Sequence, residues 1–195
     1  MYKRQDLLAR KAFLYGERNF EFPKNTSAIQ TDAAGAEILS NIIQRHPNSA
    51  TLLYFWNTQR DIAWRFEQKS QLQDVWKKMD SLDIKLVMLA HHSTPNIWKE
   101  KIAELGLIGD QWHLTDAQFS FFEDYFHKNR QPHINYDKIY DRENFLLLID
   151  KNQNLNTINE ISFRESNFTW LNNLPNRFKY MIEKQRKMQI TAEAQ

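Results

Sequence analysis

The chain contains no cysteine among its 195 residues. This absence excludes disulfide bonds, thiolate metal sites and cysteine nucleophiles within the chain, and it fits either an oxidising or a reducing compartment. Long apolar runs are missing too: no stretch approaches the roughly 18 residues that a membrane-spanning helix needs. Residues 1–20 lack the apolar centre of a signal peptide. Because MYKRQ (1–5) resembles a translated sequencing adapter, we expect the natural N-terminus, with any targeting signal, to lie upstream.

The chain has a small net charge and few glycines. The 26 basic and 24 acidic residues leave a net charge of +2, which argues against a dominant nucleic-acid interface, since such an interface needs a clustered basic face. With only four glycines, the chain has no phosphate-binding loop of the common types, and no glycines flank Ser93 as they do in a nucleophile elbow. Hydrophobic residues make up 42% of the chain and aromatic residues 13%, enough for one full-size domain with a substantial core.

Apolar runs bounded by turn residues predict buried strands, which in a parallel sheet have both faces covered. Three such runs, at 51–56, 84–90 and 144–150, predict three buried strands. We also predict a short strand at 111–114 and a returning hairpin strand at 155–161.

Helical spacing of apolar residues fills the gaps between these strands. Thr94 and Pro95 predict a helix start, and Gly106 predicts the end of that helix. The other predicted helices are 2–15, about 36–45, 61–82, 116–127 and 166–187, the last interrupted at Pro175. We predict neither a helix nor a strand at 17–30. Strands alternating with helices, then two adjacent strands and a final helix, predict an α/β fold with a mixed sheet.

Several local motifs occur in the order of one known family. They are Asp32-Ala-Ala-Gly35, LLYFWNTQRDIAW (52–64), KLVMLAHHS (85–93), Trp98 to Leu107, His113 to Asp116, and LLID (147–150) followed by KNQNL. In this order they resemble the thioredoxin fold, and within it the TlpA/ResA-type (AhpC/TSA, redoxin) thiol–disulfide proteins of bacterial envelopes, over residues 28–186.

The resemblance implies a thioredoxin-like three-layer α/β/α fold with a mixed central sheet. We expect an N-terminal helical extension at 1–27, the thioredoxin-like domain at 28–187 and a loose tail at 188–195. It also implies a periplasmic or cell-envelope location, and we expect no cofactor.

The chain departs from the family at the redox centre. Arg60 and Ala63 stand where the two cysteines would be, and a guanidinium or a methyl group cannot act as the nucleophile. Asn144 stands where the family has a cis-proline, so we predict a trans bond there. The copper-delivering SCO branch and the single-cysteine peroxidases are excluded as well, because both need a thiolate. The resemblance therefore predicts a member without thiol chemistry.

The former active-site loop is the main candidate for binding. Two tryptophans, an arginine and an acid at a helix start make a surface of the kind enriched in protein interfaces. The alternative is that Trp56 is core and Arg60–Asp61 a surface ion pair of small value. The candidate binding residues are Trp56, Gln59, Arg60, Asp61, Ala63, Trp64 and Asn144.

Histidines and acids offer a second kind of site. His91 and His92 end a predicted strand, and neighbours in a strand point to opposite faces, so we expect no chelating pair from them alone. His113 or His127 could join one of them only if the fold brings them together. Asp124 and His127 are expected to share a helix face. For all of these groups the alternative is an ordinary solvated surface. The stripe Phe119, Phe121, Phe122, Tyr125 and Phe126 is expected to be mostly core, with one or two members exposed.

Three hypotheses follow. The first is a redox-inactive thioredoxin-fold domain that binds protein or serves as a structural module in a bacterial envelope protein, with an unknown protein partner and no nucleic acid. The second is an enzyme with non-thiol chemistry, based on His91, His92, the Asp124/His127 pair or a metal. The third is structural support for a domain that lies upstream.

Overall fold

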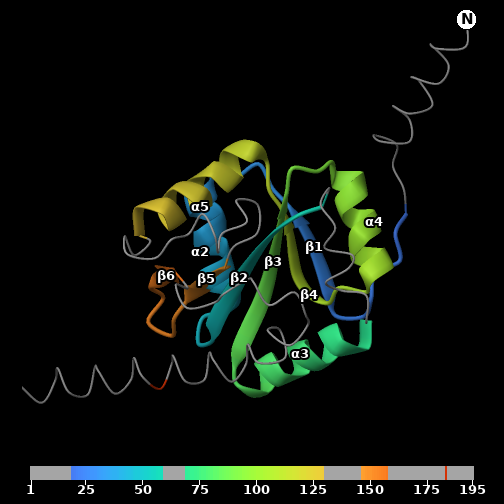
Figure 1. The fold of residues 1–195 in the computed structure, drawn as a ribbon, viewed down its shortest axis with the longest axis horizontal. Coiled ribbons are helices and arrows are strands. Elements are labelled where there is room, and N and C mark those ends of the chain that lie inside the picture. Colours follow the sequence, from blue (N-terminus) through green and yellow to red (C-terminus); the bar gives the residue numbers. More distant parts are fainter. Residues whose placement is uncertain (1–18, 59–68, 130–145, 158–182, 184–195) are drawn as a thin grey trace, which may run out of the picture.

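The computed structural model describes residues 19–58, 69–129, 146–157 and Glu183. That part of the chain contains six strands and four helices, which alternate except that the last two strands are consecutive (Figure 1). The strands are β1 (Thr26–Gln30), β2 (Ala50–Asn57), β3 (Ile84–His91), β4 (Gly109–His113), β5 (Leu146–Ile149) and β6 (Leu155–Thr157). The helices are α2 (Gly35–Arg45), α3 (Lys69–Ser81), α4 (Pro95–Leu105) and α5 (Asp116–Asn129).

The six strands form one mixed sheet in the order β1-β4-β3-β2-β5-β6. The first four strands in that order are parallel, while β5 runs antiparallel to β2 and β6 antiparallel to β5. A parallel β2–α3–β3 unit whose first strand also carries the antiparallel β5–β6 hairpin is the thioredoxin-like arrangement. The predicted fold class is therefore confirmed, and the predicted N-terminal helical extension begins outside the described residues.

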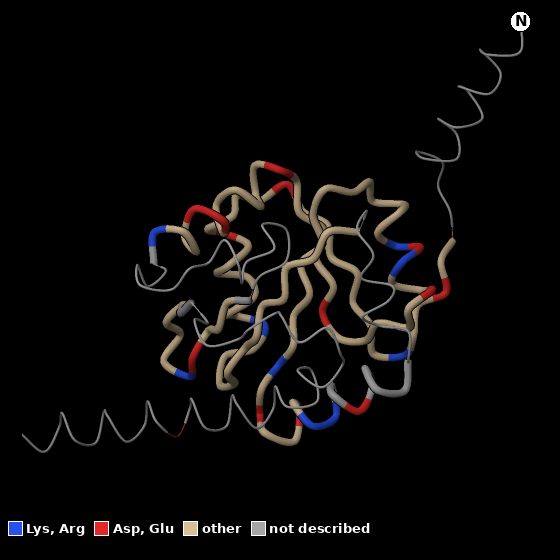
Figure 2. The backbone as a smooth tube through the Cα atoms, viewed as in Figure 1, with Lys and Arg blue, Asp and Glu red and all other residues tan. Residues whose placement is uncertain are grey.

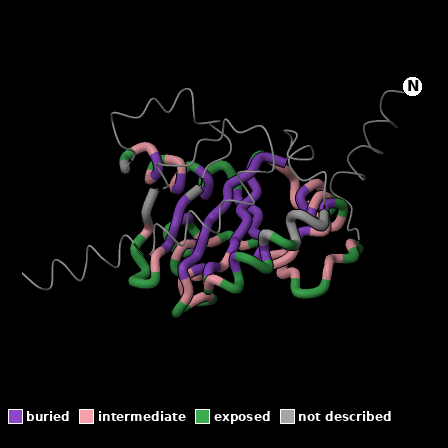
Figure 3. Tube along the Cα trace, turned by 60° about the horizontal axis from the view of Figure 1, so that its bottom comes forward, coloured by how far each residue is buried: buried purple, intermediate pink, exposed green. Residues whose placement is uncertain are grey.

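Two hydrophobic cores cover the two faces of the sheet, so the molecule has three layers (Figure 3). One core joins alternate side chains of the central strands to α3 and α4, through Trp76, Met79, Trp98 and Ile102. The other joins the intervening side chains to α2 and α5, through residues that include Ile38, Ile42, Phe119 and Phe122. The near-continuous apolar sequences of β2 and β3 arise because both of their faces are buried.

Helix α4 begins and ends where the sequence predicts. The Oγ1 of Thr94 accepts a hydrogen bond from the backbone N–H of Ile97, and Pro95 occupies the first helical position. Gly106 ends the helix in the left-handed conformation, with φ 64°, as its C-terminal cap. These local signals fix where the chain turns back towards β4.

A reciprocal cap starts α5 and ties the segment before α2 to it. Thr115 Oγ1 accepts from the N–H of Gln118, and Gln118 Oε1 accepts from the N–H of Thr115. The amide nitrogen of the buried Gln118 then donates to the carbonyls of Thr31 and Ala33. The amide oxygen and nitrogen of this side chain thus both have hydrogen-bond partners, which offsets the free-energy cost of burying them.

Gly35 lets α2 approach α5 closely. A Cβ at this position would lie 2.5 Å from the Cβ of Phe121. Atoms of that kind do not approach so closely, so any side chain here would force the two helices apart. The glycine of the Asp32-Ala-Ala-Gly35 motif therefore serves packing.

A partly buried ion cluster joins the end of α2 to the start of β4. Asp110 accepts from Arg45 through Nε at 2.7 Å and through a terminal nitrogen at 3.1 Å. The Nε2 of His46 lies 3.2 Å from the same carboxylate. Burial alone would raise the pKa of Asp110, but the hydrogen bonds from His46 and Arg45 outweigh it and lower that pKa to about 2.

Other charged residues are spread over helices and turns of the described part, with both signs interspersed (Figure 2). Asp83, in the left-handed turn between α3 and β3, accepts from Ser49 and from Lys151, both at 2.8 Å. These hydrogen bonds lower the pKa of Asp83. Among the described residues, no helix is long and apolar enough to cross a membrane.

The sequence did not predict one of the strands, and several predicted elements lie outside the described residues. Residues 26–30, within the stretch given no regular element, form β1, and the predicted domain limit at 28 falls inside this strand. The start of the predicted helix 61–82 lies outside the described residues, as do most of 166–187, residues 158–161 and the tail.

Candidate functional site

The carboxyl ends of β2, β3 and β4 meet at one edge of the sheet. Asn57 of β2 lies opposite His91 of β3, and Ala90 lies opposite His113 of β4. In open α/β sheets ligands bind at this edge, because the loops and helix N-termini that follow the strands gather there. We call residues 56–58, 91–93 and 113–116 the carboxyl edge.

Trp56 lies beneath this edge, in the core. Its side chain is 1% exposed and packs in the cluster between the sheet and α3 and α4. This position fits the alternative in which Trp56 is a core residue. Within the described part of the chain, Trp56 Nε1 and the buried Thr58 Oγ1 have no hydrogen-bond partner. Two polar atoms thus stay unsatisfied at the end of β2, which is uncommon in a folded interior.

The rest of the predicted binding surface lies outside the described residues, so it stays a prediction, as does the trans bond at Asn144. The residues concerned are Gln59, Arg60, Asp61, Ala63, Trp64 and Asn144.

The two adjacent histidines differ from the sequence prediction. His91 is fully buried and stacks on Phe119 with ring centroids 3.8 Å apart, while His92 is exposed. Their rings also contact each other edge to face, at 4.7 Å. The expectation that they point to opposite faces is wrong, because β3 ends at His91 and His92 adopts a left-handed backbone with φ 51°. That conformation costs an L-residue about 1 kcal/mol.

The turn at His92 brings its ring to the start of α5. His92 Nδ1 lies 2.8 Å from Asp116 Oδ1, and the His92 ring meets the edge of Phe119 at 5.5 Å. The side chains of His92 and Asp116 are 40% and 81% exposed, so solvent reaches both. The sequence identified Asp116 only as the end of a family motif and the start of a predicted helix. Its partner stands 24 residues earlier, and the positive φ that joins them has no glycine to signal it.

His113 is held as part of the structure. Its Nε2 donates to the backbone carbonyl of Ser93 at 2.8 Å, and its ring lies 5.3 Å from that of Trp98. Burial lowers the pKa of His113, the hydrogen bond to Ser93 opposes that shift, and the charge of Lys99 adds to it. His113 is therefore a neutral, buried ring at neutral pH.

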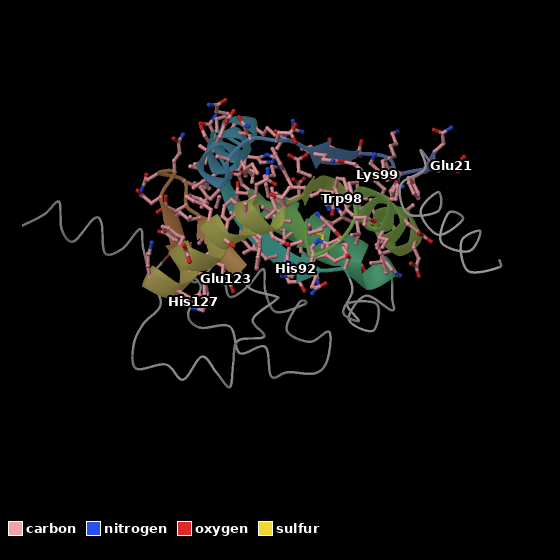
Figure 4. The ribbon with its side chains drawn as sticks, turned by 90° about the horizontal axis from the view of Figure 1, so that it is seen from above. Glu21, His92, Trp98, Lys99, Glu123 and His127 are labelled. Carbon is pink, nitrogen blue, oxygen red and sulfur yellow. The ribbon has the colours of Figure 1, made fainter. Side chains whose placement is uncertain are left out.

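On α5, the acid near His127 is Glu123 (Figure 4), at 3.9 Å between Nε2 and Oε1. Asp124 is exposed. No group of three His, Asp or Glu side chains within the described residues is arranged to hold a metal ion. The aromatic stripe is mostly core as expected: Phe119, Phe122 and Phe126 are buried, and Phe121 and Tyr125 are half-buried.

No family model and no curated protein matches the chain. Among solved structures it is similar to a thioredoxin-family thiol:disulfide interchange protein from Chlorobium tepidum, at 16% identity and a TM-score of 0.46 over 68% of this chain and 83% of that one. It is also similar to the thioredoxin domain of a thiol-disulfide oxidoreductase from Bacteroides vulgatus, at 15% identity and a TM-score of 0.45 over 70% and 83%. A third likeness is to a secreted disulfide oxidoreductase from Mycobacterium tuberculosis, at 12% identity and a TM-score of 0.42 over 67% and 80%.

Proposed function

We propose that this chain is a redox-inactive thioredoxin-fold domain that binds a protein partner through its former active-site loop, residues 56–64, in a bacterial envelope protein. The observation that carries the proposal is the absence of any cysteine from a chain with the thioredoxin-like strand order. Thiol–disulfide exchange needs an attacking thiolate, and no other side chain supplies one.

Two features support binding at this loop. The loop follows β2, whose carboxyl end lies at the edge where α/β sheets take ligands. Its sequence, WNTQRDIAW, carries two tryptophans and an arginine, the residue types that dominate binding energy in protein interfaces.

The redox half of the proposal is tested by restoring the cysteines. The natural chain should not accelerate insulin reduction by dithiothreitol, whereas Arg60→Cys/Ala63→Cys should gain activity if the loop keeps the thioredoxin geometry. Arg60→Ser/Ala63→Ser is the matched control and should stay inactive. Turnover by the cysteine-free chain would refute the proposal.

The binding half is tested by trapping. The single variant Arg60→Cys should form mixed disulfides with a defined set of cell-envelope proteins, and a cysteine placed far from the loop, Glu37→Cys on the exposed side of α2, should not. Proteins recovered with the unmodified chain should be lost with Arg60→Ala/Trp64→Ala. An unchanged set would remove this surface as the binding site. The envelope location is tested by the upstream sequence of the full-length gene, which should encode an export signal.

A further inference from the structure

The exposed ring of His92 is held in a single tautomer. A carboxylate oxygen only accepts hydrogen bonds, so the 2.8 Å contact with Asp116 Oδ1 places the proton of a neutral imidazole on Nδ1. The lone pair then lies on Nε2. No other hydrogen bond joins the His92 ring to the described residues, so this nitrogen is available at the carboxyl edge.

The backbone at His92 sets the direction of its ring. His92 has a left-handed conformation, φ 51°, as a few other non-glycine residues of the described part do at turns, and here that conformation turns the ring towards the start of α5. The contact with Phe119 and the hydrogen bond to Asp116 together fix the orientation of the ring. The neighbouring hydroxyl, Ser93 Oγ, is buried, so it cannot meet a reagent from solvent.

We propose that His92 and Asp116 form an imidazole dyad that accepts acyl groups from activated carboxylic esters. His92 is the nucleophile, and Asp116 is a positioning residue that holds the tautomer and stabilises the cation formed during attack. The proposal is independent of the binding function above, because no residue of the loop 56–64 takes part.

The reaction has two steps. His92 Nε2 bonds to the carbonyl carbon, and the bond from that carbon to the alkoxy oxygen breaks. The oxygen leaves with the electron pair as an alkoxide and takes a proton from solvent to become the alcohol. The Nδ1 proton passes by way of Asp116 to solvent, which leaves a neutral acyl-imidazole. Water then adds to the acyl carbon, releases the carboxylic acid and restores the imidazole. The sum is ester plus water giving acid plus alcohol.

Acyl transfer is favoured over metal binding by the surroundings of the dyad. A stable metal site needs several ligands, and the described residues offer no group of three at this place. A lone nitrogen supported by a carboxylate suffices for nucleophilic attack.

The chain supplies its own control for reactivity. The side chain of His127 is 38% exposed, close to the 40% of His92, and its neighbouring carboxylate, Glu123, lies 3.9 Å away, beyond hydrogen-bond range. The exposed fractions of the two side chains are therefore matched. An excess rate at His92 that Asp116→Ala removes reports the hydrogen bond to Asp116 rather than exposure.

The test labels the full chain with diethyl pyrocarbonate, a carbonyl electrophile that gives a stable histidine adduct, and follows each histidine by peptide mass spectrometry. His92 should react roughly tenfold faster than His127. Asp116→Ala should remove the excess, whereas Glu123→Ala should leave both rates unchanged. In parallel, the natural chain should hydrolyse p-nitrophenyl acetate faster than free imidazole does, and the variant His92→Gln should lose this excess.

A spectroscopic readout separates positioning from simple structural support. In ¹⁵N-resolved NMR spectra, His92 should show the Nδ1–H tautomer, and Asp116→Ala should return it towards the mixture of an unrestrained imidazole. Since Asp116 is exposed, this variant should fold, which its circular dichroism would verify. Equal labelling of His92 and His127, or an Nε2–H tautomer at His92, would overturn the proposal.

Discussion

The ion cluster around Asp110 allows the change in the free energy of unfolding of one variant to be predicted. Asp110 is 9% exposed and accepts hydrogen bonds from Arg45 and His46 that lower its pKa from 3.8 to about 2. Each unit of pKa difference between the folded and unfolded chain is worth about 1.4 kcal/mol, so the ionised carboxylate contributes roughly 2 kcal/mol to folding at neutral pH. Asp110→Asn should remove this contribution.

The pH dependence has a definite sign. Because the pKa is lower in the folded chain, the unfolded chain takes up the proton first as the solution is acidified. The contribution of Asp110 is therefore complete above about pH 4 and is lost as the pH falls towards 2. Asp110→Asn should cost roughly 2 kcal/mol at pH 7, or roughly 4–8 °C in Tm, and much less at pH 2.5.

Urea unfolding of both chains at pH 7, 4 and 2.5, followed by circular dichroism, measures this difference. Asp80→Asn is the matched control, since Asp80 also pairs with a cation, Lys85, but its side chain is 69% exposed. An exposed pair is worth less than about 1 kcal/mol. If Asp110→Asn had no effect at pH 7, or an equal effect at pH 7 and pH 2.5, the assigned role of the cluster would be refuted.

Three further variants probe packing, hydrogen bonding and charge. Gly35→Ala should destabilise the chain by about 1–3 kcal/mol in urea, because its Cβ would meet the Cβ of Phe121. Gln118→Leu should cost about 1–3 kcal/mol, since the carbonyls of two half-buried residues lose their donor, and hydrogen exchange should rise in the segment before α2. A cost below 0.5 kcal/mol would show that water replaces this donor. His113 has a lowered pKa, so the unfolded chain binds its proton first and stability should fall as the pH drops below about 6.5. His113→Gln should flatten that fall between pH 7 and 5, and an unchanged slope would assign it to other groups.

Local signals predicted the elements whose causes are local. Thr94, Pro95 and Gly106 mark the limits of α4 because capping depends on residues within one turn. The buried strands β2 and β3 were also visible, since a strand covered on both faces reads as a continuous apolar run. β1 was missed because TSAIQ is half polar, and its pairing with β4 is what makes it a strand.

The candidate site was harder to predict because it depends on distant residues. His92 was named from its place at the end of a strand, but its pairing with Asp116 depends on a left-handed turn that histidine rarely makes. The cluster at Asp110 likewise joins residues 65 positions apart, Arg45 and Asp110. Sequence patterns locate such residues on elements, and only the packing of the elements brings them together.

The pairing of β1 also sets a time order for folding. Within the described residues β1 pairs only with β4, so Thr26 must wait for Gly109 to be made before it can join the sheet. On the ribosome, β2 and β3 can pair well before that point, and the early strand must remain unpaired meanwhile. Contacts this distant along the chain form slowly because they close a long loop. We therefore expect β1 to join the sheet late during synthesis. A factor that binds nascent chains should contact β1 before it contacts the other strands.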